Sequence, residues 1–491
     1  MPFDPKSVHP SFTWNLPIWK TMRDCIEGED AIKKGMELYL PIKSGTRAIE
    51  DATDRQAAYE AYMVRAEFPE IVAPTIRGAL GTMLAQPAKI ELPPQLESMR
   101  ERATRDGLTL DALHRRIAAE IMSVGRYGLL PSIDDRGNPY IAQYCAEAIR
   151  NWDVPEPEQG WVLLDESGME LDRSTGKWEN VERYRECFVE NGAYVSRVYT
   201  LTTGAGQPGT KWEAGADTVA QMTPRGGQAR PLGILPFVFV DTNDLSAEPD
   251  DVPLYGLAKI AVRVYRMDAD YTFALHMTSE PTPWASGFPD PGASIKNGAV
   301  PTTIGSSKLW ILPLHGSAGY LEFSGQGLDA QQKAIEDSLT RALVFGVQLM
   351  ENKKSAESGD ALETRLGSQH ATLRSVAMTS AAGLEKALRN LAVWVGADPE
   401  AVTVEPNLDF ADHTLSGQEI TALVSGWMSG GYSRSTLFWN LQRGGVINPD
   451  RTLEEELEEI NREADEVAAR NEEEMRLAAE IAAENNPPVV E

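Results

Sequence analysis

The sequence predicts an α+β fold that is mainly helical, with an antiparallel sheet in its first half. Apolar residues recur at spacings of three and four within 254–277, 328–350 and 362–396, which is the period of a helix with one buried face. Short β-branched and aromatic runs separated by turn residues lie between 127 and 200, a pattern typical of antiparallel strands. The C-terminal region returns to helical periodicity and is rich in glutamate.

The first third of the chain is predicted to form helices. Thr53 or Asp54 is expected to cap a helix that ends before Pro69. A second helix is expected within 74–87, because a proline suits the first turn of a helix and another closes the segment. Thr109 is expected to cap a third helix.

Strands are predicted to follow these helices. The apolar and aromatic runs begin at Tyr127, Pro139, Trp161, Arg183 and Ala193. Residues 202–227 are rich in glycine and threonine, so we expect a long loop or exposed hairpin there. A buried strand is expected over 234–240.

Two long helices flank a small insert. The helices are predicted over 254–277 and 328–350, and the residues between them are rich in proline, glycine and serine, with strand-like segments at 309–312 and 320–323. The stripe of the second helix carries Ile335, Leu339, Ala342, Gly346 and Leu349. We interpret the insert as a separate module between the two helices.

A short polar loop separates the second of these helices from a third. It contains the adjacent lysines Lys353 and Lys354, and the helix over 362–396 follows at once. On the residues alone, a solvated turn is the favoured interpretation of these lysines.

The C-terminal part is predicted as one strand and several helices. The strand is expected over 402–410, and two short helices over 418–443 are broken at Gly430 and restart at Ser433. Thr452 and Glu455 form a capping-box pattern that opens a glutamate-rich helix. The last residues, 485–491, are expected to be disordered.

Composition limits the classes of function. At 491 residues the chain has room for two to four domains. Its net charge of −27 argues against a protein that grips DNA phosphates, which needs lysine and arginine to displace counterions. The ordinary explanation of this charge is solubility. The more specific explanation is a surface that lies near nucleic acid without adhering to it.

Targeting and metal signals are absent from the sequence. No apolar run approaches the ~18 residues of a membrane-spanning helix, and the N-terminus has no secretory pattern. Cys25, Cys145 and Cys187 are odd in number and far apart, which indicates free thiols in a reducing compartment. The six histidines have no zinc-ligand spacing, so we predict no metal and no cofactor.

Several motifs suggest ligand chemistry but lack its context. Residues 325–330 match a dinucleotide-binding glycine pattern, yet no second parallel strand with a terminal acid follows. Residues 204–211 resemble a phosphate loop whose lysine is misplaced. The acidic run at 454–459 is typical of a solvated helix face. The tryptophans lack a basic groove, which favours packing over base stacking.

The order of several segments resembles a known family. These segments lie at 59–68, 144–152 with Asn151-Trp152, 280–287 with Pro283-Trp284, 320–325, 407–410 and 433–437. In this order and spacing, the chain from Tyr39 to Ile460 resembles the portal proteins of tailed bacteriophages, the head–tail connector rings.

The resemblance implies a layout along the chain. Its parts are a wing of helices and antiparallel sheet (1–253), a first stem helix (254–278), a clip (279–326), a second stem helix (327–350), a tunnel loop (351–361), a wing helix and strand (362–417), a helical crown (418–484) and a disordered tail (485–491). A stem helix pair cannot bury both of its faces alone, so the fold is expected to be ring-forming.

The resemblance also implies the function. The expected protein is not an enzyme but a virion protein at the portal vertex of the capsid, present in the host cytoplasm during assembly. A dodecameric ring of this chain would pass double-stranded DNA non-specifically during packaging and ejection, and would dock terminase, head-completion or adaptor proteins, major capsid protein and scaffold. No membrane contact is expected.

The resemblance assigns residues to two functional places. The tunnel-loop residues that face DNA are Lys353, Lys354, Ser355 and Ser358. The clip residues that face the motor are Trp284, Phe288, Lys296 and Trp310.

Two alternatives remain open. A minor head protein or adaptor would also be a virion structural protein, but would lack the helix–loop–helix flanked by a clip-like insert. An α+β enzyme would need a pocket with perturbed titratable groups, for which the sequence offers no compact candidate.

Overall fold

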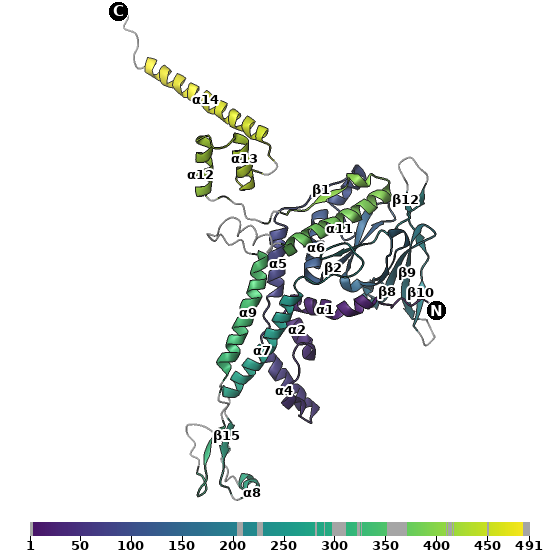
Figure 1. Cartoon of the computed structure of the whole chain (residues 1–491), viewed down its shortest axis with the longest axis vertical. Coiled ribbons are helices and arrows are strands. Elements are labelled where there is room, and N and C mark those ends of the chain that lie inside the picture. The colour runs from purple at the N-terminus through teal and green to yellow at the C-terminus, as the bar shows by residue number, and fades with distance from the viewer. Residues whose placement is uncertain are drawn as a thin grey trace, which may run out of the picture. The chain divides into compact units, whose positions relative to one another are not determined.

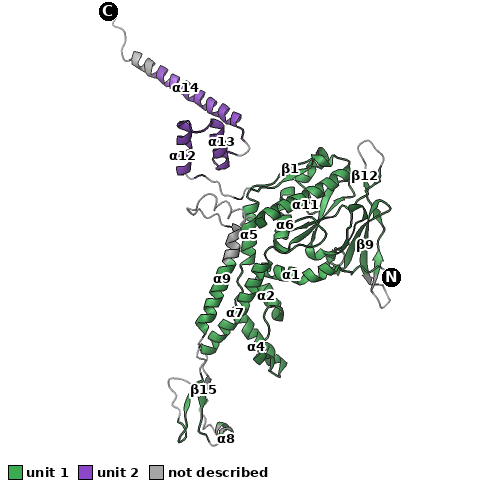
Figure 2. Cartoon of the chain, in the orientation of Figure 1, with its two compact units in different colours: residues 1–410 green, residues 411–491 purple. Residues whose placement is uncertain are grey.

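The computed structural model divides the chain into two compact units, Met1–Phe410 and Ala411–Glu491 (Figures 1 and 2). It describes residues 3–203, 210–222, 229–279, 282–288, 290–296, 311–321, 325, 327–350, 371–408, 410, 415, 417–448 and 451–484. Helices and strands are both abundant, and every strand pairing in these ranges is antiparallel, which confirms the α+β class.

Helices form the N-terminal part of the first unit. They are α1 (Pro10–Glu27), α2 (Glu29–Lys34), η1 (Met36–Leu38), α3 (Ser44–Arg47), α4 (Ala52–Arg65), α5 (Val72–Met83), η2 (Pro94–Arg100) and α6 (Leu110–Val124). The cap of α4 is Asp51 and not Thr53 or Asp54, because the Asp51 carboxylate accepts from both of their amides, at 2.8 and 3.0 Å. The predicted capping residue of this helix was therefore wrong by two or three positions.

Helix α6 begins and ends with local signals. The Thr109 hydroxyl accepts from the Ala112 amide at 3.2 Å, so the predicted cap is confirmed. Gly125 ends the helix in the left-handed region, at φ 77°, where a glycine carries no side-chain penalty.

Two sheets follow α6. The larger has the order β10–β9–β8–β5–β4, with β11 also paired to β9, and the smaller has the order β14–β2–β3. Their strands are β2 (Arg126–Ile133), β3 (Pro139–Cys145), β4 (Ile149–Asp153), β5 (Trp161–Asp165), β8 (Arg183–Glu190), β9 (Ala193–Thr203), β10 (Thr210–Ala214), β11 (Thr218–Val219) and β14 (Val238–Asp241). The five predicted runs correspond to β2, β3, β5, β8 and β9, so these strand predictions are confirmed.

Short elements complete the first unit outside the helix pair described below. They are η3 (Ala146–Ala148), η4 (Pro157–Gln159), η5 (Pro399–Ala401) and the strand pairs β6–β7 (Gly168–Asp172, Lys177–Val181), β12–β13 (Gln221–Met222, Arg230–Pro231) and β1–β17 (Lys89–Glu91, Thr403–Glu405).

One predicted hairpin and two predicted strands can be compared with the structure in extent. The 202–227 region includes a β9–β10 hairpin, so the hairpin expectation holds for its described residues. The buried strand is shorter than expected, because only Val238–Asp241 pairs with β2 and Pro236 has no amide to donate. The strand expected over 402–410 is limited to β17, since its partner β1 has three residues.

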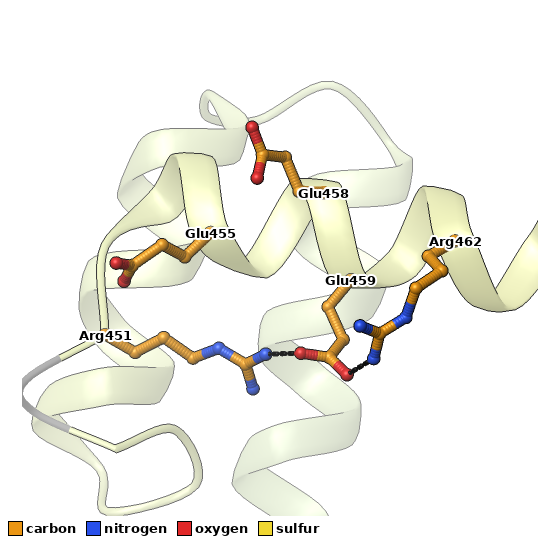
Figure 3. A pocket seen from close by; sticks show the side chains of 5 residues that line it. All are labelled: Arg451, Glu455, Glu458, Glu459 and Arg462. Carbon is orange, nitrogen blue, oxygen red and sulfur yellow. Dashed lines mark hydrogen bonds and ion pairs between the residues drawn. The ribbon is translucent and has the colours of Figure 1, made fainter.

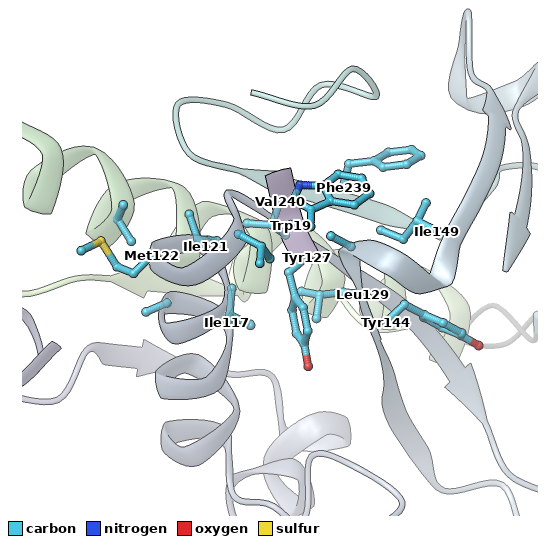
Figure 4. Close-up of a cluster of buried hydrophobic side chains, with 14 of the residues drawn as sticks. Trp19, Ile117, Ile121, Met122, Tyr127, Leu129, Tyr144, Ile149, Phe239 and Val240 are labelled. Carbon is cyan, nitrogen blue, oxygen red and sulfur yellow. The ribbon is translucent and has the colours of Figure 1, made fainter. Parts of the chain in front are cut away.

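The core of the first unit lies where α1, α6 and α11 (Ala371–Val395) cover the small sheet. Figure 4 shows Trp19, Ile117 and Ile121 gathered with apolar side chains of β2 and β14, and all three are fully buried. Helix α11 packs so closely that a Cβ on Gly383 would lie 2.5 Å from Val240 Cγ2. Residues 362–370, which the sequence assigns to the same helix, lie outside the described ranges.

One ion pair is fully buried in this core. Arg126 lies opposite Asp241 in the β2–β14 ladder, and its Nη1 donates to Asp241 Oδ2 at 2.9 Å while Nη2 donates to the Ala247 carbonyl at 2.8 Å. The guanidinium also stacks on Trp152 and Phe239, with its Cζ 4.6 and 4.8 Å from the ring centroids. Burial raises the pKa of Asp241 and the facing guanidinium opposes that rise.

The second unit is helical. It contains α12 (Gly417–Met428), α13 (Arg434–Arg443) and α14 (Leu453–Glu484). Ser433 caps α13 through the Thr436 amide at 3.2 Å, and the predicted capping box of α14 is present, because the amides of Thr452 and Glu455 bond each other's side chains at 2.9 and 3.2 Å. These helix starts are confirmed, and the expected disordered tail, 485–491, lies outside the described residues.

Candidate functional site: the α7–α9 helix pair and its insert

Two long helices pack side by side in the first unit. They are α7 (Tyr255–Ser279) and α9 (Leu328–Met350), and a small insert connects them (Figure 1). The helical periodicity of both segments is confirmed. The insert contains β15 (Thr282–Ala285), α8 (Pro291–Lys296) and β16 (Ala318–Leu321).

Burial falls along α7 from its beginning to its end. Seven side chains between Leu257 and Ala269 are buried, and Tyr265 is fully enclosed. Near the end of the helix, Leu275 and Met277 are 38% and 44% exposed. The first part of α7 therefore belongs to the core, while its last turns present apolar side chains to the surface.

Polar contacts from the N-terminal helices hold the middle of α7. Asp270 accepts from the Tyr62 hydroxyl at 2.8 Å and pairs with Lys43 at 3.1 Å. The Lys43 ammonium also lies 3.8 Å from the centroid of Phe273, and Arg266 donates to the Tyr39 carbonyl at 2.5 Å. These contacts orient the helix. Local sequence patterns do not reveal them, because the partners are some 200 residues away.

Helix α9 buries little surface within this chain. Among its described side chains, Ser338 and Ala342 are buried, and Ile335 and Leu339 are half-buried. The predicted stripe thus faces α7 and α5 over Ile335, Leu339 and Ala342, whereas the side chains of Gly346 and Leu349 lie outside the described set. Most of the remaining described positions of α9 are polar and exposed.

The insert is a two-stranded ladder. Thr282 to Ala285 pair with Leu321 to Ala318, and Trp284 faces Gly319. A Cβ on Gly319 would lie 3.3 to 3.4 Å from the indole, so this glycine makes room for the tryptophan. The predicted strand at 320–323 overlaps β16, but the one at 309–312 is wrong for its described residues, because Ile311 and Leu312 form no ladder.

The structure separates the predicted motor-facing residues. Trp284 lies on β15 and is 44% exposed, Phe288 lies half-buried after that strand, and Lys296 is the exposed last residue of α8. Trp310 lies outside the described residues. The described three share the insert but come from different elements.

The predicted tunnel loop lies outside the described residues. Lys353, Lys354, Ser355 and Ser358 all fall within 351–370, so their assignment stays a prediction.

The described titratable groups give little support to nucleophilic catalysis. Burial raises the pKa of the thiols, to about 12 for Cys25 and about 11 for Cys145 and Cys187, so each stays protonated at neutral pH. His114 Nε2 lies 3.1 Å from Ser380 Oγ, the spacing of a general base and a serine nucleophile. Both side chains are buried, however, and the Ser380 hydroxyl donates to the Ala377 carbonyl at 3.0 Å.

A shallow polar cavity lies at the start of α14 in the second unit (Figure 3). Both of its lining arginines, Arg451 and Arg462, pair with the same carboxylate, Glu459. In the ranges that the structure covers, no group of histidine, cysteine or carboxylate side chains is arranged to hold a metal ion. No helix in those ranges is long and apolar enough to cross a membrane.

Comparison with known proteins gives limited information. A family model described as a domain of unknown function (DUF4055) matches residues 253–395, which span the helix pair, the insert and α11 but less than half of the chain. No curated protein matches.

Two solved structures have low similarity to this chain. One is the neck of a native GTA particle computed with C12 symmetry, at 12% identity and TM-score 0.37, covering 75% of this chain and 88% of that one. The other is the neck of an empty GTA particle computed with C6 symmetry, at 11% identity and TM-score 0.37, covering 77% and 90%. Scores this low support no conclusion about fold or function.

Proposed function

We propose that this chain is a portal protein, a ring-shaped channel at one capsid vertex through which double-stranded DNA is packaged and ejected. The observation that carries the proposal is the α7–α9 pair with its strand insert, followed along the chain by the lysine-containing loop. The resemblance of the sequence to tailed-phage portal proteins supports the same assignment.

The burial pattern supports assembly into a ring. Helix α9 buries only Ser338 and Ala342 among its described side chains, and the end of α7 exposes Leu275 and Met277. A neighbouring copy would cover such surfaces in a head-to-tail interface, which gives a ring when the rotation between successive copies closes. About twelve copies are expected from the family resemblance.

The net charge of the chain supports a channel that DNA passes without tight binding. Each copy carries a net charge of −27, and an acidic wall repels the phosphate backbone. Lys353 and Lys354, with Ser355 and Ser358 beside them, would then form local rings of contact. A lysine presents a point charge without a bidentate grip, which suits transient contact with phosphates.

The insert would serve as the docking site for the packaging motor. It presents Trp284 and Lys296 to solvent, with Phe288 half-buried beside the strand pair. Exposed aromatic side chains are common anchors of protein interfaces. Together with Trp310, these residues are the proposed contacts for terminase, while head-completion or adaptor, capsid and scaffold proteins would bind elsewhere on the ring.

Native mass analysis and negative-stain imaging of the same purified sample test this function. Rings of about twelve 53.9-kDa chains, near ~650 kDa and with a central hole, are expected. Closed rings without a channel, or a dimer that persists when scaffold protein is added, would instead favour a minor head or adaptor protein.

A further inference from the structure

A cavity of ≈ 580 Å³ lies between the two sheets of the first unit. Strands β2 and β3 of the small sheet and β8 and β9 of the large sheet line it, and Trp394 of α11 also contributes. Nothing in the proposed channel function uses this cavity.

The rim of this cavity is positively charged. Arg105, Arg183 and Arg185 line it, and Glu166 is the one carboxylate among the described lining residues. A local excess of positive charge is unexpected on a chain whose net charge is −27. Arg185 and Arg183 are partly compensated by Glu166 and Glu170, so Arg105 supplies most of the remaining attraction for an anionic group.

The arginines are held in orientations that leave donors available. Arg185 donates to both oxygens of Glu166 at 2.6 and 3.1 Å and to Ser196 Oγ at 2.9 Å. In the described part of the chain, these bonds leave two of its five N–H donors without a protein acceptor. Arg183 pairs with Glu170 at 2.8 Å.

Arg105 is the most available of the three. Its side chain is exposed and its guanidinium Cζ lies 5.2 Å from the Tyr140 ring centroid. Among the described residues it has no carboxylate partner. Stacking on an aromatic ring orients a guanidinium while its N–H edge stays open to an anion.

The floor of the cavity is apolar. Tyr144, Tyr194 and Trp394 are buried there, and each polar atom of these rings is already bonded inside the protein: to Glu166 at 2.6 Å, to Cys187 Sγ at 3.3 Å and to the Gln221 carbonyl at 3.1 Å. The donors of these three rings are therefore occupied, and their ring faces favour an apolar part of a ligand.

The neighbouring cavity is a separate one. It has a volume of ≈ 430 Å³ and also reaches Arg105 and Tyr140, but Gln143 and Cys145 line it, which alternate along β3 with the residues of the first cavity and so face the other side of the small sheet. Its charged lining holds carboxylates as well as arginines, so the excess of arginine belongs to the first cavity.

We propose that the cavity between the two sheets binds an acidic peptide segment of a partner protein, with an apolar side chain on the aromatic floor and flanking carboxylates on Arg105 and Arg183. Guanidinium groups match carboxylates in bidentate geometry. A nucleic acid is disfavoured, because its many phosphates would meet the repulsion of the acidic chain outside the arginine rim.

Fluorescence anisotropy with the full-length protein tests the proposal. The probe is a fluorescein-labelled peptide that alternates glutamate and leucine, and the matched probe carries glutamine in place of glutamate. Saturable, salt-sensitive binding of the glutamate probe is expected, with each of Arg105→Ala and Arg183→Ala weakening it about tenfold through a lost charge-assisted hydrogen bond.

The control variant is Arg173→Ala, which removes an exposed arginine outside the cavity and is expected to leave affinity unchanged. Arg105→Glu is expected to bind a peptide that alternates lysine and leucine more tightly than it binds the glutamate probe. The proposal would be overturned if the glutamate probe did not bind, or if the glutamine probe bound equally well. It would also be overturned if Arg173→Ala lost as much affinity as the cavity variants, or if a duplex oligonucleotide displaced the probe. Arg105 and Arg183 are at the surface, so matched melting temperatures will show that the variants fold.

Discussion

Replacing Asp241 with valine provides a direct test of how the core of the first unit is held together. The carboxylate and the Arg126 guanidinium face each other across β2 and β14, with no exposed surface on either side chain. Asp241→Val would leave a guanidinium buried with one remaining hydrogen bond, to the Ala247 carbonyl at 2.8 Å.

The expected loss in the free energy of unfolding depends on which interactions the Arg126 guanidinium retains. Removing one partner of a buried ion pair costs about 3–5 kcal/mol, because the other charge stays desolvated without compensation. Here the rings of Trp152 and Phe239, at 4.6 and 4.8 Å, continue to stabilise the cation. We therefore expect the lower end, about 3 kcal/mol. Arg126→Met together with Asp241→Val removes both charges and is expected to return to within about 1 kcal/mol of the original chain.

Urea denaturation of the full chain, followed by tryptophan fluorescence, measures these differences as midpoint shifts at constant slope. The double-mutant cycle isolates the pair from the packing change of each single variant. An unchanged midpoint in Asp241→Val, or a double variant that is less stable than both single variants, would refute this account.

Three further perturbations have defined outcomes. Burial lowers the pKa of His114 from 6.5 to about 4, so between these pH values only the unfolded chain takes up a proton. The free energy of unfolding should therefore fall by about 3 kcal/mol as the pH drops from 6.5 to 4. Melting curves of His114→Gln should lack this part of the pH dependence. Gly383→Ala would put a methyl 2.5 Å from Val240 Cγ2 and should cost about 1–3 kcal/mol in urea, part of which Val240→Ala in the same chain recovers. Lys353→Ala with Lys354→Ala should leave rings intact by negative stain but lower DNA packaging; packaging equal to that of the unaltered chain would contradict the tunnel-loop assignment.

Local signals made the helices predictable. Thr109, Ser433 and Thr452 each bond backbone amides within three residues, so the sequence neighbourhood alone determines where those helices begin. The wrong cap of α4 has the same local origin, since Asp51 stands two residues before Thr53 and competes for the same role.

Strand extents depended on distant partners. A strand ends where its partner ends, so the segment after residue 402 was limited by β1, more than 300 residues earlier in the chain. For the same reason the sequence did not reveal the cavity between the two sheets. Arg105 and Arg185 come from segments 80 residues apart, and the fold alone brings them to one rim.

The choice between arginine and lysine separates the two basic features of this acidic chain. Arg185 is fixed by Glu166 and Ser196, and Arg105 by Tyr140, so their forks are oriented before any ligand arrives. A preorganised fork loses little freedom on binding and favours a lasting, carboxylate-specific contact. The adjacent lysines of the proposed tunnel loop are strongly hydrated point charges, which favours brief contacts with any phosphate that passes. If both proposals hold, arginine-to-lysine exchange at position 105 should weaken peptide binding, whereas lysine-to-arginine exchange at 353 should slow DNA passage by holding phosphates longer.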